Sequence, residues 1–173
     1  MKRFFLGIVL MALCSFSGFA QKIGYIDTEE ILNGIPEYQT AQQQLNELAD
    51  KYKSVIEAEI GKIDVLYQSY QNQKAALSES QRQVKENEII EKEKAVKEKQ
   101  KIYFGEEGIM ASKSEELLTP IKNKVQSAID AVSSKEGYSL VLDLAAMSGV
   151  VYKDTSLDLT QKVFKYLNIS NNI

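Results

Sequence analysis

The dominant pattern in this chain is helical: a proline-free stretch, residues 37–119, in which apolar residues recur at steps of three and four. The stretch has one break, at residues 76–80. Its first half predicts a helix from about Glu37 to Ala76. The apolar positions of that helix are Ala41, Leu45, Leu48, Tyr52, Val55 or Ile56, Ile60, Ile63, Tyr67 and Tyr70.

The second half of the stretch carries an apolar residue at every seventh position, the spacing of a coiled-coil seam. These residues are Ile89, Val96, Tyr103, Met110 and Leu117. Ser78 and Gln81 have the spacing of a helix-capping box, so the return helix is expected to begin at Glu79. If the turn centres just before Ser78, the numbers of paired residues sum to about 155, which places Tyr52 opposite Tyr103. Four of the five seam positions then face apolar residues, and the pattern predicts a long antiparallel hairpin.

Two features disturb the return helix. The segment Gly105–Gly108 predicts either a flexible joint or two glycines tolerated within a continuous helix, and we favour the second. Pro120 lacks a backbone N–H, so it is expected to interrupt and kink the helix, whose apolar stripe continues to Gly137.

The two ends of the chain predict short strands, at Lys22–Asp27, Tyr138–Asp143 and Gly149–Lys153. Three such strands make a sheet too small to be stable alone, with open edges. We therefore expect symmetric copies of the chain to complete the sheet. The residues expected to hold this oligomer are Ile23, Tyr25, Leu140, Val141, Leu142, Val150 and Val151.

Short helices are expected beside these strands. Asp27 or Thr28 can cap a helix that ends at Asn33. Pro36 suits the first turn of the long helix, and Asp158 is expected to cap a terminal helix.

The first twenty residues have the pattern of a cleavable signal peptide. Lys2 and Arg3 precede an apolar core, Phe4–Leu13, and Gly18-Phe19-Ala20 forms a small-x-small cleavage site. An uncleaved membrane anchor is the alternative, but the apolar core is shorter than the ~20 residues that a membrane span needs. Cys14 is the only cysteine and lies in this segment, so the mature chain is expected to be exported and free of cysteine.

These patterns predict a mainly α fold with a small β body, to which a long antiparallel helical hairpin is attached as a coiled-coil arm. The expected division is a signal peptide (1–20), a body segment (21–36), the hairpin arm (37–119) and a second body segment (120–173).

Charge and composition exclude several functions. Removal of Lys2 and Arg3 leaves 19 basic against 24 acidic residues, a net charge of −5, which argues against nucleic-acid binding and against attraction to anionic lipid. The chain has no histidine, so it lacks His-based catalytic arrangements and the usual zinc ligands. Asp27, Asp143 and Asp154 are expected to be turn and cap residues rather than catalytic ones. We expect no enzyme activity, no cofactor and no metal.

The arm carries more apolar residues than one seam requires. The surplus residues are Ile60, Ile63, Tyr67, Tyr70 and Ile90. They form either an adaptable surface for a binding partner or part of a wide hairpin core, and both alternatives stay open for each residue.

The order of strand, short helix, long hairpin, strand pair and terminal helix resembles the OmpH/Skp family of periplasmic chaperones. The resemblance rests on Lys22–Asp27 and Pro36-Glu37 at the front, and on Gly137–Asp143, Val151-Tyr152, Asp158-Leu159-Thr160 and Val163 at the back. It implies a jellyfish-like homotrimer in the periplasm. It also implies an ATP-independent holdase that keeps unfolded outer-membrane proteins from aggregating on their way to the outer membrane. The best-known members are strongly basic, and the acidic charge here argues against carrying over contact with lipopolysaccharide or membranes.

A structural or adaptor coiled coil of the cell envelope, without unfolded clients, is the alternative function. Unpaired apolar surface on the arm distinguishes the two hypotheses, because a spacer does not need it.

Overall fold

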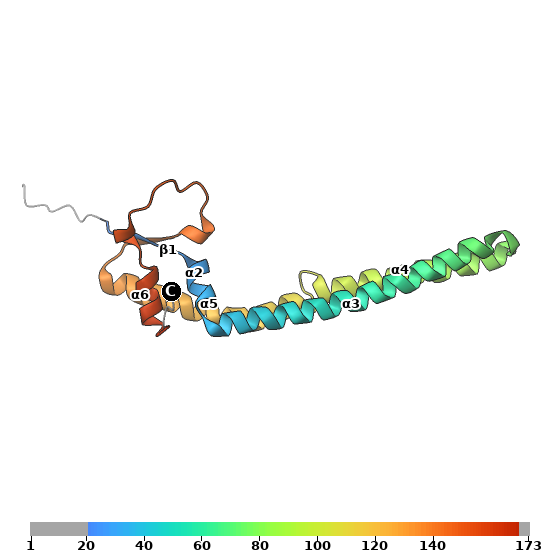
Figure 1. Ribbon diagram of the computed structural model, residues 1–173, viewed down its shortest axis with the longest axis horizontal. Coiled ribbons are helices and arrows are strands. Elements are labelled where there is room, and N and C mark those ends of the chain that lie inside the picture. Colours follow the sequence, from blue (N-terminus) through green and yellow to red (C-terminus); the bar gives the residue numbers. More distant parts are fainter. Residues whose placement is uncertain (1–20, 170–173) are drawn as a thin grey trace, which may run out of the picture. The chain divides into compact units, whose positions relative to one another are not determined.

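The computed structural model describes residues 21–169 (Figure 1), so the predicted signal peptide lies outside the described residues. The chain forms two compact units. We call the described residues of the first unit, 21–31 and 127–169, the body, and the second unit, residues 32–126, the arm. The helices and strands are β1 (Ile23–Ile26), α2 (Thr28–Asn33), α3 (Pro36–Gln73), α4 (Glu79–Phe104), α5 (Ile109–Glu136), β2 (Leu140–Asp143) and α6 (Thr160–Tyr166). The mainly α fold with a small β body is confirmed.

The body is built on a two-stranded parallel sheet. Its register runs from Ile23 opposite Leu140 to Ile26 opposite Asp143. Gly24 lets the Tyr138 ring pack close against β1, because a Cβ there would lie 2.7 Å from that ring. On its other side β1 makes a single bridge, from Tyr25 to residue 158. The outer edge of β2 therefore has no strand partner within residues 21–169.

The prediction of a third strand at Gly149–Lys153 is wrong, because this segment forms no strand. Val151 is 99% exposed and Tyr152 is 82% exposed. Strand preference expresses packing against neighbouring strands rather than an intrinsic backbone preference. This segment has no such neighbour in the body of a single chain, so its β-branched residues do not form a strand.

Aspartates hold the turns of the body, as the sequence predicts. The Asp27 carboxylate accepts a hydrogen bond from the Glu30 N–H (2.9 Å) at the start of α2. The Asp143 and Asp154 carboxylates accept from backbone N–H groups two residues onward, at 3.1 and 2.9 Å. The Asp158 carboxylate accepts from the Thr160 N–H (2.8 Å) at the start of α6. All four carboxylates hold local backbone geometry, and that of Asp143 also accepts from the Thr28 N–H (3.1 Å) and the Thr28 hydroxyl (2.6 Å), which joins β2 to the start of α2.

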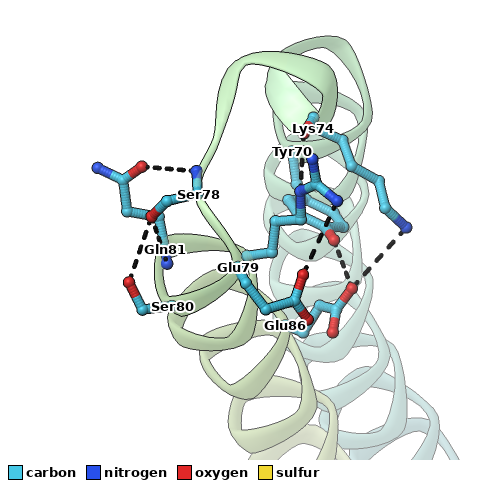
Figure 2. A network of polar contacts seen from close by, with 8 residues as sticks. Tyr70, Lys74, Ser78, Glu79, Ser80, Gln81 and Glu86 are labelled. Carbon is cyan, nitrogen blue, oxygen red and sulfur yellow. Dashed lines mark hydrogen bonds and ion pairs between the residues drawn. The ribbon is translucent and has the colours of Figure 1, made fainter.

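The arm is the predicted antiparallel hairpin, in which α3 and α4 run side by side (Figure 1). Pro36 occupies the first turn of α3. At the tip, the Gln81 N–H donates to the Ser78 hydroxyl (3.4 Å) and the Ser78 N–H donates to the Gln81 side chain (2.9 Å), as Figure 2 shows. The predicted capping box and the start of α4 at Glu79 are confirmed.

The predicted register is confirmed near the middle of the arm. The Tyr52 and Tyr103 rings stack with centroids 4.1 Å apart and planes inclined by 12°. Two apolar clusters hold the hairpin together. The cluster nearer the tip contains Ile56, Ile63, Tyr70, Ile89 and Val96, and the other contains Ala41, Leu45 and Leu118.

The continuous helix favoured at Gly105–Gly108 and the interruption expected at Pro120 are both wrong. The chain leaves the helix at Gly105–Gly108, where continuous helix was favoured, and α4 and α5 are separate helices. By contrast, α5 runs through Pro120 without interruption. Pro120 is exposed, so water can satisfy the helical carbonyl that a proline leaves unpaired.

The register gives a direct test. In a chain lacking residues 1–20, cysteines replacing Tyr52 and Tyr103 are expected to form a disulfide within one chain, because the stacked rings show that these two positions face each other across the hairpin. A pair replacing Tyr52 and Val96, displaced by one heptad, is the control. Non-reducing electrophoresis and intact mass measure both products. Preferential oxidation of the displaced pair would contradict the register.

Candidate functional site

The arm exposes large apolar side chains outside its two clusters. The most exposed, by fraction of the residue's surface, are Val65 (69%), Val84 (66%), Ile102 (53%), Tyr67 (51%), Ile90 (45%), Phe104 (41%), Ile60 (40%), Ile109 (40%) and Val55 (37%). Single exposed apolar residues are common on protein surfaces. Their arrangement therefore decides whether any of them form a binding surface.

The structure divides the five surplus apolar residues that the sequence singled out. Ile60, Tyr67 and Ile90 are exposed. Ile63 and Tyr70 are buried, at 8% and 4% exposure, within the apolar cluster nearer the tip. Their assignment to a surplus surface is corrected, since both are part of the hairpin core.

The three exposed residues lie along one side of the hairpin. Ile60 and Tyr67 are seven residues apart on α3, and the next step of seven reaches Lys74, the first residue after this helix. The Lys74 ammonium lies 3.9 Å from the Glu86 carboxylate of α4, so this row of α3 faces the side of α4 that carries Glu86. Ile90 follows Glu86 by four residues and shares that side. We call Ile60, Tyr67 and Ile90 the arm flank.

A network of polar contacts joins the two helices of the hairpin at the end of the arm flank nearer the tip (Figure 2). The Tyr70 hydroxyl donates to the Glu86 carboxylate, and this hydrogen bond, more than burial, raises the pKa of Tyr70. The Arg82 guanidinium donates to the Lys74 carbonyl (3.0 Å). These contacts fix the relative position of α3 and α4, so the apolar row is presented on a rigid support.

The residues predicted to hold an oligomer differ in how exposed they are in a single chain. Tyr25 is buried, at 6% exposure, and its burial, with Asp158 nearby, raises the pKa of its hydroxyl. Ile23 and Leu140 are opposite each other in the sheet and are 43% and 49% exposed. Val141 and Leu142 are half-buried, while Val150 and Val151 are exposed in the loop after β2. The body of one chain thus leaves apolar side chains uncovered beside an open strand edge.

Two other kinds of site are absent from the part of the chain that the structure describes. No group of three or more acidic, histidine or cysteine side chains is placed to hold a metal ion among residues 21–169. No helix within the same residues is long and apolar enough to span a membrane.

The arrangement of a small sheet and a long hairpin matches a known family. The family model described as outer membrane protein (OmpH-like) matches residues 22–167. The chain belongs to the OmpH-like family. Chaperone protein Skp of Yersinia enterocolitica is 27% identical over 160 residues, which cover 92% of this chain and 93% of that protein. Chaperone protein Skp of Pectobacterium atrosepticum is 26% identical, with the same two coverages.

The fold of this OmpH-like protein also has a solved counterpart. A crystal structure from Caulobacter crescentus, described as an OmpH-like outer membrane chaperone, superimposes with a TM-score of 0.62. It covers 92% of each chain at 13% sequence identity. At that identity the likeness concerns the fold.

Sequence reasoning missed part of the exposed apolar surface of this OmpH-like protein. It did not single out Val65, Val84, Ile102, Phe104 and Ile109. A signal was available, because these residues lie off the positions that recur every seven residues and so cannot all be seam residues. Ile102, Phe104 and Ile109 lie at the interruption between α4 and α5. The favoured prediction there was a continuous helix.

One ion pair in the body predicts an acid-dependent change in stability. A hydrogen bond from Lys162 lowers the pKa of Glu136, and the same contact raises the pKa of Lys162. A carboxyl with a lowered pKa stabilises the fold at neutral pH, and that contribution is lost as pH falls below its ordinary value of 4.5. The pair is partly exposed, so the effect is small.

We expect the thermal unfolding midpoint of the wild type to fall on acidification through this range, and to fall less in Glu136→Gln. Circular dichroism at a series of pH values measures it. Glu29→Gln, which changes the charge equally without disturbing an ion pair, should follow the wild type. Parallel curves for the wild type and Glu136→Gln would show that the pair contributes nothing.

Proposed function

We propose that the mature chain is an ATP-independent holdase chaperone of the periplasm. Its clients are unfolded outer-membrane proteins, which it binds and protects from aggregation during transit to the outer membrane. The observation that carries this proposal is membership of the OmpH-like family together with the exposed arm flank.

The chemistry of the arm flank suits this task. An unfolded β-barrel protein exposes many short apolar segments of varied sequence. Its holder needs broad and weak contacts rather than one deep pocket. Half-exposed isoleucine and tyrosine side chains in a row supply such contacts, since each can cover apolar surface without demanding a particular partner. Binding of this kind needs neither a nucleotide nor a metal.

The same observation argues against the alternative, a spacer or adaptor without clients. The arm is already held together by two buried clusters, so it does not need the flank residues for its own stability. A rod that only spaces other components would have charged residues at these positions.

We further propose that the functional unit is a homotrimer held through the body. The open edge of β2 and the exposed Ile23–Leu140 pair support an oligomer, because strand edges and apolar pairs left uncovered in one chain are covered by copies. The number three comes from the family resemblance. The proposal does not include contact with lipopolysaccharide or an anionic membrane, because the chain is acidic.

Dilution of a denatured client tests the function. Purified chain 21–173 is mixed at low micromolar concentration with a urea-unfolded β-barrel protein, and light scattering follows aggregation after the urea is diluted. We expect the client to stay soluble at a fixed stoichiometry without ATP. An equal mass of an unrelated acidic coiled coil is the control. Aggregation at the same rate with both proteins would contradict the proposal.

A further inference from the structure

A groove opens in the arm where the return helix is interrupted. It has a volume of about 650 Å³. Its lining residues are Glu98, Lys101, Ile102, Gly105, Glu106, Glu107, Gly108 and Ile109. Neither the capping box of α4 nor the arm flank involves these residues. The groove is therefore a separate feature of the arm.

Two glycines make the groove possible. A Cβ at Gly105 would lie 2.4 Å from the Lys101 carbonyl oxygen, and a Cβ at Gly108 would lie 2.8 Å from the Ile102 carbonyl oxygen. Both distances are shorter than contacts of real side chains, so no other residue fits this loop without a backbone shift. The chain thus gives up helical hydrogen bonds here to form a defined loop, whereas α3 is continuous.

The walls of the groove combine apolar surface with unpaired negative charge. Ile102 is 53% exposed and Ile109 is 40% exposed. Glu98, Glu106 and Glu107 are exposed, and within residues 21–169 none of the three takes part in an ion pair. Lys101 is the single basic residue in the lining, so the groove carries a net charge of −2.

The neighbouring helix end adds to the preference for a cation. The 26-residue helix α4 ends at Phe104, and the carbonyl groups of its last turn carry partial negative charge toward the groove side of the loop. Glu106 and Glu107 precede α5, where their negative charge is favourable beside the partial positive charge of the helix N-terminus. Glu98 lies in the last two turns of α4, where its carboxylate is near the partial negative charge of the helix C-terminus. Negative charge at that place is unfavourable for the helix alone and favourable for a bound cation.

We propose that this groove binds segments of an unfolded client in which an apolar side chain is flanked by lysine or arginine. The inference rests on the proposed function for the identity of the client, but the groove's preference for such segments stands on its own charge and shape. The apolar side chain packs against Ile102 and Ile109, and the flanking cations approach the three glutamates. The arm flank, in contrast, selects for apolar character alone.

Other occupants fit less well. A metal ion needs converging ligands, and no group of three acidic side chains within the described residues meets that condition. An acidic segment would meet three uncompensated carboxylates. Among segments of a protein, charge complementarity selects a cationic one.

Short labelled peptides test the proposal with the chain 21–173. The probe is a flexible peptide in which one leucine is flanked by two lysines on each side, and the two comparison peptides carry glutamate or serine in place of lysine. Fluorescence anisotropy measures their affinities. We expect the lysine peptide to bind about tenfold more tightly than the serine peptide, since several exposed charge contacts together are worth about that factor. Its affinity should fall when ionic strength rises from about 0.05 M to about 0.5 M.

The decisive variant is E98Q/E106Q/E107Q. It should lose the preference for the lysine peptide and retain the affinity for the serine peptide. The matched control is E57Q/D64N/E115Q, which removes the same charge from exposed arm residues that are also without ion pairs and lie outside the groove. The control should keep the preference. A parallel loss in both variants would assign the preference to net charge and overturn the proposal.

Two further outcomes separate this inference from the proposed function. If the groove variant keeps the peptide preference while the wild type holds the denatured client, the groove proposal fails and the holdase proposal stands. If the wild type prefers the lysine peptide but never holds the client, the groove is real and the holdase proposal fails. A change in sedimentation of the groove variant, with peptide binding unchanged, would identify the groove as a contact between copies and overturn the proposal.

Discussion

The triple variant I60S/Y67S/I90S is expected to abolish holding of an unfolded client without changing the fold or the oligomeric state. All three side chains are 40–51% exposed and lie outside the buried clusters. Exposed substitutions of this kind usually change stability by no more than about 0.5 kcal/mol each. The variant, however, would offer no apolar side chain in the arm flank for the apolar surface of the client to contact. Single substitutions should weaken holding only slightly, because broad binding surfaces spread their energy over several contacts.

The control for this variant is V55S/V65S/V84S, which removes three exposed apolar side chains from other sides of the arm. Val65 is two residues before Tyr67, and Val84 two residues before Glu86. Two residues along an α-helix turn the side chain by about 200°, so both valines lie far from the flank. Client aggregation after dilution, at increasing molar ratios, compares the two variants with the wild type. Equal loss in both triples would show that total apolar surface matters rather than the flank.

The first design that the sequence suggests, replacing all five surplus residues, would give an ambiguous result. Ile63 and Tyr70 are core residues of the hairpin, and truncating a buried side chain costs about 2–5 kcal/mol. Loss of holding could then reflect an unfolded arm. The threefold variant avoids this, and its thermal unfolding midpoint, measured by circular dichroism, shows whether the hairpin is intact.

Client binding by the wild type should also have the thermodynamic signature of apolar burial. We expect a negative heat-capacity change on binding, because apolar surface leaves water. Salt should have only a modest effect on the total affinity, since the flank itself contains no charge. Isothermal titration calorimetry at several temperatures measures the first quantity. A heat-capacity change near zero, or a steep salt dependence that persists in E98Q/E106Q/E107Q, would contradict an apolar flank.

The sequence predicted the hairpin because its signals are local. A heptad spacing and a capping box depend on residues within a few turns, and both Ser78 and the Tyr52–Tyr103 pair lie where the pattern placed them. Ile63 and Tyr70 could have been assigned correctly from the same rule. Together with Ile56 they recur every seven residues, so they form the α3 half of the seam that meets Ile89 and Val96.

The errors have a different origin, because they depend on context beyond the helix itself. Two glycines in a helix cost about 1 kcal/mol each relative to alanine, which a long hairpin can bear, so composition alone could not decide between helix and loop at Gly105–Gly108. Pro120 was judged by its missing N–H, but its exposed position lets water replace the lost bond. The segment Gly149–Lys153 has strand-forming residues without a strand beside it. The arm flank was only partly predicted for the same reason, since exposure depends on which side of each helix the partner covers.

Val141→Asp is expected to convert the oligomer to a monomer. Val141 lies in β2 opposite Gly24, on the face of the sheet that also carries the buried Ile26. Val141 is half-buried, and a charge placed there loses part of its hydration without gaining a partner, so both the body and any contact between bodies should be weakened. Sedimentation equilibrium at micromolar concentration measures the oligomeric state, and a monomeric wild type would contradict the premise.

A second substitution separates loss of the interface from damage to the body. Leu140→Asp introduces the same charge one residue earlier, on the opposite face, where the side chain is 49% exposed in the single chain. The body of a single chain should therefore tolerate this charge better than the one at Val141, whereas an apolar contact with a neighbouring copy would not. We expect both variants to sediment as monomers and Val141→Asp to have the lower unfolding midpoint of the two, since loss of the partner copies lowers the midpoint in both. If Leu140→Asp remains an oligomer, the exposed pair of Ile23 and Leu140 lies outside the interface, and copies of the chain meet through another part of the body.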